Sequence, residues 1–111
     1  MASLSNRQQI FAKNVGKLIE FIFSKGYACT FGEAYRTKEQ AEWNAAKGIG
    51  IKNSLHCKRL AVDLNLFFQG KYLSDSESYR PLGEYWESLH PANRWGGRFK
   101  DGNHFEMQEI H

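Results

Sequence analysis

The sequence predicts a single domain of the α+β class, and three observations support this. The chain has 111 residues, which is room for one modest hydrophobic core. It contains both patterns typical of amphipathic helices and patterns typical of short strands. No repeat, linker or low-complexity segment divides it. We therefore expect one α+β domain over residues 1–111.

The composition is that of a folded protein. Hydrophobic residues make up 41% of the chain and aromatic residues 14%, which excludes an intrinsically disordered chain. The formal net charge of +3 would suit an anionic polymer, either nucleic acid or cell wall, and selects neither. Because no basic run with interleaved aromatic residues is present, we expect no nucleic-acid partner.

Neither a leader nor a membrane anchor is expected. The first residues, MASLSNRQQ, hold no apolar segment before a small-residue cleavage site. The most apolar stretch, LIEFIF, is too short to cross a bilayer. We therefore expect synthesis in the cytoplasm without a signal peptide, and no stable membrane association. Cys29 and Cys57 are expected to be free thiols, and two cysteines cannot form an all-thiolate zinc site.

The first expected element is a helix. Ser5-x-x-Gln8 has the form of a capping box and would begin it. Gly26 suits the position just after its end. Apolar residues recur between them at steps of four, three and four, on one face of a helix: Phe11, Val15, Leu18 and Ile22.

A short strand and a short helix are expected next. Residues 27–32, YACTFG, predict a strand with alternate side chains on one face. Thr37-x-x-Gln40 is a second capping box, and its helix would end near Ala46. A loop marked by Gly48 and Gly50 would follow.

The second half of the chain predicts two strands, a helix and a last strand. The main strand spans Leu60 to Phe68, and Gly70 marks a turn into the short strand KYL. A helix would open at Ser76 or Ser78 and end near Pro91. Its apolar residues would be Leu82, Tyr85, Trp86 and Leu89. We expect Trp95-Gly96-Gly97 to be a loop and HFEMQEI to be the last strand.

An aspartate interrupts the main strand. Side chains alternate between the two faces of a strand. One face is entirely apolar: Leu60, Val62, Leu64, Leu66 and Phe68. Asp63 lies on the other face, beside Asn65, where polar groups are tolerated. A carboxylate on a central strand is costly to bury unless water, a basic side chain or a metal ion pairs with it.

Two neighbouring motifs favour a metal ion. His56 lies seven residues before Asp63, and Asp101 lies three residues before His104 in DGNHFE. Two histidines and an aspartate are good zinc ligands, and a catalytic zinc takes three protein ligands and keeps a position for water. Because seven is an odd separation, the chain must bend between His56 and Asp63, and residues 57–59 are the natural place.

At these residues the sequence resembles the VanY-like zinc peptidases, the group of D-Ala-D-Ala carboxypeptidases and L-alanyl-D-glutamate endopeptidases. Their motif is matched by Ser54-Leu55-His56, then Asp63, then Asp101-x-x-His104. The segments GEAYRT, YRPLGEYWESLHP and RWGGRF extend the match. The chain is most similar to the short phage endolysins, which cut the stem peptides of peptidoglycan.

The resemblance implies a fold and a set of residue roles. The fold is Hedgehog/DD-peptidase-like, in which a small antiparallel sheet carries the zinc site and packs against helices. The zinc ligands would be His56, Asp63 and His104. Cys57, next to a ligand, could compete for the metal, and Glu106 could either support a ligand or be a solvated strand carboxylate.

Three further residues receive roles from the resemblance. Asp101 would be the catalytic acid and base, which takes a proton from water and passes it to the leaving amine. Arg36 would bind the scissile carbonyl or the developing oxyanion, where a fixed positive charge is useful. Ser54 would bind the substrate or order the zinc loop.

The implied function is that of a zinc-dependent endolysin that hydrolyses the L-alanyl-D-glutamate bond. We expect a monomer that acts on Gram-negative cell wall in the periplasm after holin-type release. Three alternatives stay open: a D-Ala-D-Ala carboxypeptidase, a non-catalytic zinc-stabilised module that binds peptidoglycan or a protein partner, and a metal-free domain that binds nucleic acid. The last predicts salt-dependent DNA binding and no effect of chelators.

Overall fold

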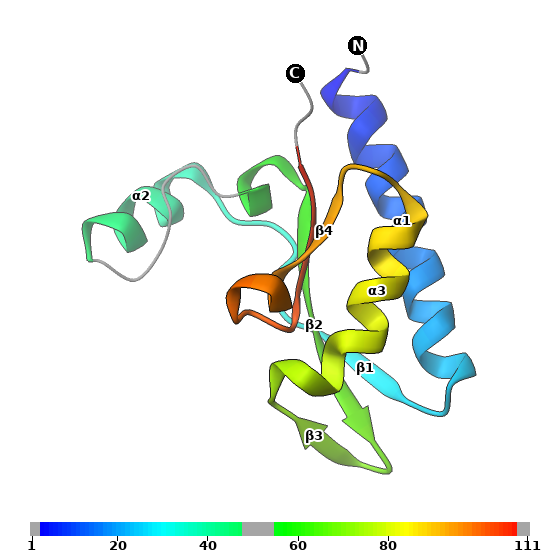
Figure 1. Ribbon diagram of the computed structural model, residues 1–111. Helices are drawn as coiled ribbons and strands as arrows, with labels where there is room; N and C mark the ends of the chain where they lie inside the picture. Colours follow the sequence, from blue (N-terminus) through cyan, green and yellow to red (C-terminus); the bar gives the residue numbers. More distant parts are fainter. Residues whose placement is uncertain (1–2, 48–54, 109–111) are drawn as a thin grey trace.

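Two helices lie side by side against a small sheet, and a third helix projects on the opposite side (Figure 1). The computed structural model describes residues 3–47 and 55–108. The packed helices are α1 (Leu4–Ser24) and α3 (Arg80–Leu89), and the projecting helix is α2 (Lys38–Ala46). In the described part of the chain, no helix is both long and apolar enough to cross a membrane.

The sheet is antiparallel throughout. Its main path has the order β1-β2-β5-β4, and β3 pairs with β2 off this path. The strands are β1 (Ala28–Phe31), β2 (Ala61–Phe68), β3 (Lys71–Leu73), β4 (Asn93–Trp95) and β5 (His104–Met107). The expected α+β fold with a small antiparallel sheet is therefore confirmed.

The core lies between β2 and the two packed helices. The expected apolar face of β2 is buried, except that Phe68 at its end is 39% exposed. Opposite it lie buried side chains from α1 and α3: Phe11, Leu18, Ile22, Leu82 and Trp86. The Trp86 indole also donates a hydrogen bond to the backbone oxygen of Glu106, at 2.9 Å, which fixes α3 against β5.

The start of α1 differs from the expectation. The N-cap is Ser3, whose hydroxyl accepts from the backbone N–H of Asn6, and the capping box predicted at Ser5 was wrong. The Gln8 side chain is engaged elsewhere, because it donates to the backbone oxygen of Lys58 at 2.8 Å. That bond ties α1 to the chain just before β2. Gly26 has φ +85°, as its position after the helix requires.

The cap of α2 is as expected, with one difference. The Thr37 hydroxyl accepts from the backbone N–H of Gln40, at 3.0 Å. The Gln40 side chain donates forward to Asn44 and does not reach back to the cap. The loop expected at Gly48 and Gly50 lies outside the described residues.

The segment around Trp95 contains structure that the sequence pattern missed. Asn93–Trp95 forms β4, and the following 3₁₀ helix η3 spans Gly96–Phe99. The helix expected from Ser76 or Ser78 begins as a 3₁₀ turn, η2 (Ser76–Tyr79), and continues as α3. A strand of three residues is too short to show an alternating pattern.

Candidate metal and catalytic centre

Three elements bring the expected metal-binding side chains together. Asp63 of β2 and His104 of β5 are direct partners in the antiparallel register. His56 lies in the 3₁₀ helix η1 (Leu55–Lys58), just before β2. One ligand atom from each of the three residues lies within 4.8 Å of the others. Side chains far apart in sequence thus converge on one point at the sheet.

The bend between His56 and Asp63 lies where it was expected. The backbone N–H groups of Arg59 and Leu60 donate to the oxygens of His56 and Leu55, at 3.3 and 3.0 Å. Arg59 has φ +56°, a left-handed conformation that ends the 3₁₀ turn and starts the strand in a new direction. The turn therefore brings His56 round to the face that Asp63 occupies.

The side-chain atoms fit a zinc ion. Asp63 Oδ1 lies 3.4 Å from His56 Nε2 and 3.2 Å from His104 Nδ1. Two imidazole nitrogens and one carboxylate oxygen are a typical donor set for catalytic zinc, with one position left for water. Cys57 does not join this set, because its thiol points to the backbone oxygen of Thr37, and both cysteines are free, as expected.

Glu106 supports His104 from behind. Its Oε1 lies 2.7 Å from His104 Nε2, and both side chains are buried. A second contact, 3.4 Å from its Oε2 to Arg94, holds the same carboxylate. A carboxylate on the far nitrogen of a ligand histidine fixes the ring and leaves the other nitrogen for the metal. Glu106 is therefore not a solvated strand carboxylate.

The charges of the cluster stabilise one another. Burial raises the pKa of Asp63, but its hydrogen bonds to His104 and His56 outweigh burial and lower the pKa to about 2. Burial lowers the pKa of His104, but hydrogen bonds to Asp63 and Glu106 outweigh it and raise the pKa to about 9. Without metal, the cluster therefore holds a proton on His104, and a metal ion bound at this ring would have to displace it.

Asp101 stands at the edge of the cluster. The backbone N–H of His104 donates to the backbone oxygen of Asp101 at 3.1 Å. This bond closes the expected tight turn into β5. Asp101 Oδ2 lies 4.0 Å from His104 Nδ1, and its side chain is 54% exposed. Burial raises the pKa of this carboxyl above its ordinary value. A carboxyl with a raised pKa beside a metal site suits proton transfer.

Trp95 fixes the turn that carries Asp101. Its ring is 1% exposed, and its indole donates to the backbone oxygen of Gly102 at 2.7 Å. The ring lies close to Gly83 and Gly97, where an added Cβ would come within 2.1 and 2.0 Å of it. Trp95 is thus a core residue that holds the turn between Asp101 and His104.

A short backbone segment, residues 32–36, holds Arg36 beside the cluster. Gly32 N–H donates to the Asp63 oxygen at 2.7 Å, and Asp63 N–H donates to the Glu33 oxygen at 2.8 Å. The Arg36 N–H donates to the His56 oxygen at 3.3 Å, and its guanidinium pairs with the Glu33 carboxylate. Sequence reasoning missed Glu33, although it stands three residues before Arg36 in GEAYRT. Ser54 lies outside the described residues.

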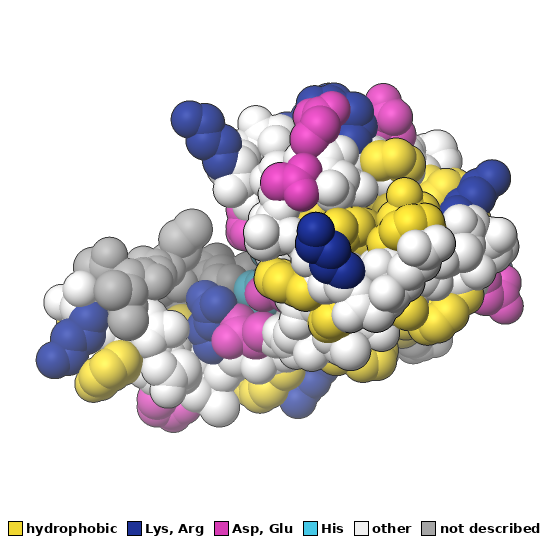
Figure 2. Space-filling model, turned by 90° about the horizontal axis from the view of Figure 1, so that it is seen from below, with side chains coloured by type: hydrophobic (Ala, Val, Ile, Leu, Met, Phe, Trp, Pro, Cys, Tyr) yellow, Lys and Arg dark blue, Asp and Glu magenta, His cyan; other side chains and the backbone are white. Residues whose placement is uncertain are grey.

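One side of the molecule is hollowed (Figure 2). Figure 2 looks into this hollow, which lies between the arm that carries α2 and the rest of the molecule. A histidine side chain is visible in it, beside basic and acidic side chains.

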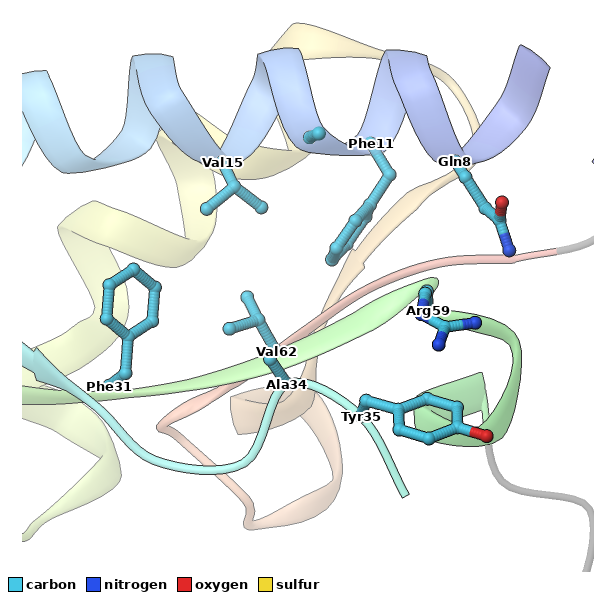
Figure 3. A pocket seen from close by; sticks show the side chains of 9 residues that line it. Gln8, Phe11, Val15, Phe31, Ala34, Tyr35, Arg59 and Val62 are labelled. Carbon is cyan, nitrogen blue, oxygen red and sulfur yellow. The ribbon is translucent and has the colours of Figure 1, made fainter. Parts of the chain in front are cut away.

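A separate cavity of about 380 Å³ lies between α1 and β2 (Figure 3). Phe11, Val15 and Val62 form apolar walls, and the guanidinium of Arg59 stacks on Tyr35 at its edge, 4.1 Å from the ring centre. Val62 and Asp63 point to opposite faces of β2. This cavity is therefore not part of the metal site.

A profile of the D-alanyl-D-alanine carboxypeptidase family matches residues 47–107. A comparison with curated protein sequences finds no match.

The fold is similar to that of several solved structures, two peptidases among them. The chain is similar to the L-Ala D-Glu endopeptidase ChiX of Serratia marcescens, with a TM-score of 0.74 and 17% identity, over 88% of this chain and 77% of that one. It is also similar to a mutant of the vancomycin-resistance D,D-pentapeptidase VanY from a VanB-type resistance cassette, solved with Zn(II). There the TM-score is 0.62 and the identity 18%, over 90% of this chain and 71% of that one.

Proposed function

This chain belongs to the D-alanyl-D-alanine carboxypeptidase family, the VanY-like zinc peptidases, and from that premise we propose that it hydrolyses the L-alanyl-D-glutamate bond of peptidoglycan stem peptides. Family membership makes it a zinc metallopeptidase and a peptidoglycan hydrolase. The bond that it cuts and the roles of individual residues belong to the proposal.

The convergence of His56, Asp63 and His104 is the observation that carries the mechanism. In the proposal these three side chains hold zinc. A purely structural zinc site usually has four protein ligands, whereas this cluster has three and a free carboxyl, Asp101, at its edge. An open position next to a proton-accepting group favours catalysis over a structural or binding role.

When bound, zinc acidifies a water molecule and polarises the carbonyl of the scissile amide. Asp101 accepts the proton released during attack and passes it to the leaving amine. Its half-exposed carboxyl is accessible from solvent, and its raised pKa favours holding the proton between these two steps. Arg36 supplies positive charge where the carbonyl oxygen becomes negative. Ser54 contacts the substrate or orders the zinc loop.

Two observations support the L-alanyl-D-glutamate bond. The segments that extend the motif resemble those of short phage endolysins, and the fold is similar to an L-Ala D-Glu endopeptidase. The family's own description and the similarity to VanY support a second candidate, removal of the terminal D-alanine. We expect the first activity to be the stronger.

The biological setting follows from the same proposal. Residues 1–111 act as one monomeric peptidase domain of a phage-type endolysin. The mildly basic charge favours contact with an anionic cell wall, and the proposed target is the wall of a Gram-negative host. The enzyme would reach the periplasm through a holin-type route.

The test is digestion of purified Gram-negative peptidoglycan, with fragments identified by mass spectrometry, with and without a chelator. We expect chelator-sensitive release of peptides that begin with D-glutamate. Release of D-alanine alone would instead establish the carboxypeptidase. No release by zinc-loaded protein would refute the catalytic role and favour a binding module. Asp101→Asn serves as the catalytic control, since it keeps the zinc ligands.

A further inference from the structure

The backbone before α2 is hydrogen-bonded to two residues of the metal cluster, Asp63 and His56. Two backbone hydrogen bonds join residues 32 and 33 to Asp63, and a third joins Arg36 to His56. An added Cβ at Gly32 would come within 3.0 Å of the Asp63 Cβ and 3.2 Å of its backbone oxygen, so the close approach favours glycine. Glu33 is therefore held at a defined position beside the cluster.

One oxygen of Glu33 meets two groups of the site. Its Oε1 pairs with the Arg36 guanidinium and lies 3.7 Å from His56 Nδ1. This oxygen is fully buried, although the side chain as a whole is 36% exposed. A buried carboxylate oxygen between a guanidinium and an imidazole attracts both groups and stabilises them in fixed positions.

The two histidines have matching surroundings. Each turns one ring nitrogen to Asp63 Oδ1 and the other to a glutamate: His104 to Glu106 at 2.7 Å and His56 to Glu33 at 3.7 Å. The second contact is longer than a hydrogen bond and acts through charge. A carboxylate on this side favours the Nδ1-protonated ring, which leaves Nε2 for the metal.

We propose that Glu33 is a positioning residue that couples the zinc ligand His56 to the substrate-binding arginine Arg36. Its carboxylate orients His56 from the Nδ1 side and at the same time holds the Arg36 guanidinium at the mouth of the site. The part that concerns substrate rests on the proposed function, whereas the part that concerns zinc does not.

The first test measures zinc affinity by competition with a chromogenic chelator, without any substrate. Glu33→Gln keeps the size of the side chain and removes its charge, and we expect zinc affinity to fall by about 10-fold or more. Arg36→Ala should leave zinc affinity undiminished, because it leaves the carboxylate in place. Glu77→Gln is the matched control, since Glu77 and Arg80 form an exposed pair of the same spacing on a different element.

Zinc binding by Glu33→Gln as tight as in the wild type would overturn the proposal, and so would an equal loss in Glu77→Gln. Thermal unfolding in chelator shows that each variant is folded, and Glu33→Asp should recover part of the zinc affinity.

The second test measures hydrolysis of a stem peptide at saturating zinc. We expect Glu33→Gln to lower kcat/KM in the same direction as Arg36→Ala does, because the guanidinium loses its anchor. An unchanged kcat/KM would overturn the coupling to Arg36. If wild-type protein cuts no peptide, the proposed function fails, while the zinc titration still decides the role of Glu33.

Discussion

Replacing Gly83 by alanine tests whether α3 and the turn between Asp101 and His104 are joined through Trp95. A Cβ at this position would lie 2.1 Å from Cδ2 of the Trp95 ring, 2.3 Å from Cγ and 2.5 Å from Cε3. Ordinary contact needs more than 3.4 Å, so the ring or the helix must move by about 1 Å or more. The ring cannot simply slide away, because Gly97 lies equally close to it.

The size of the effect follows from these contacts. Overpacking of a rigid core costs about 1–3 kcal/mol, and a fully buried indole falls at the upper end. Strain on the buried hydrogen bond to Gly102 adds about 1 kcal/mol. Alanine has the better helix propensity and offsets about 1 kcal/mol. We expect a net loss of about 3 kcal/mol, which corresponds to roughly 10–20 °C in Tm for a domain of this size.

The assay is thermal and urea unfolding of the metal-free protein, together with zinc titration. Zinc affinity should fall as well, because Trp95 holds the turn that carries His104. Gly16→Ala is the matched control: nothing lies within 4 Å of its added Cβ on α1, so it should stabilise the protein by about 0.5–1 kcal/mol. If Gly83→Ala proves as stable as the wild type, the packing argument is refuted.

Three further outcomes are expected. Glu106→Gln should weaken zinc binding by about 10- to 100-fold in a competition titration, because the far nitrogen of His104 loses its carboxylate partner. Asp101→Asn should bind zinc nearly as well as the wild type but lose hydrolysis of peptidoglycan by at least about 100-fold, and near-normal hydrolysis would contradict its role. The metal-free protein should lose stability between pH 6.5 and about 9, where His104 with its raised pKa gives up the proton that its carboxylate neighbours stabilise, and Tm against pH in chelator measures this.

Local sequence predicted much of the fold, because the signals lie within one turn or one strand. The apolar spacing along α1, the cap at Thr37 and the alternation along β2 each depend on neighbouring residues, and the structure contains all three. The capping box predicted at Ser5 failed because Gln8, its other half, donates to the backbone oxygen of Lys58, fifty residues away. Such a contact leaves no local pattern.

The main features of the candidate site were also visible in the sequence. Its residue types and spacings, from His56 to His104, are visible in the sequence and carry the resemblance to the zinc peptidases. Alternation along β2 put Asp63 on the face away from the main core, and the odd spacing required a bend after His56. The structure has both features, since the turn at Arg59 brings His56 onto Asp63.

The sequence by itself determined which side chains could bind a metal, because ligand chemistry and strand alternation are properties of single residues and their neighbours. Only the tertiary structure decided which carboxylates support these metal-binding side chains. Glu106 is buried against His104, and Glu33 lies between His56 and Arg36. Pairing of distant strands and anchoring of the segment before α2 create these contacts, since they join residues that the chain order keeps apart.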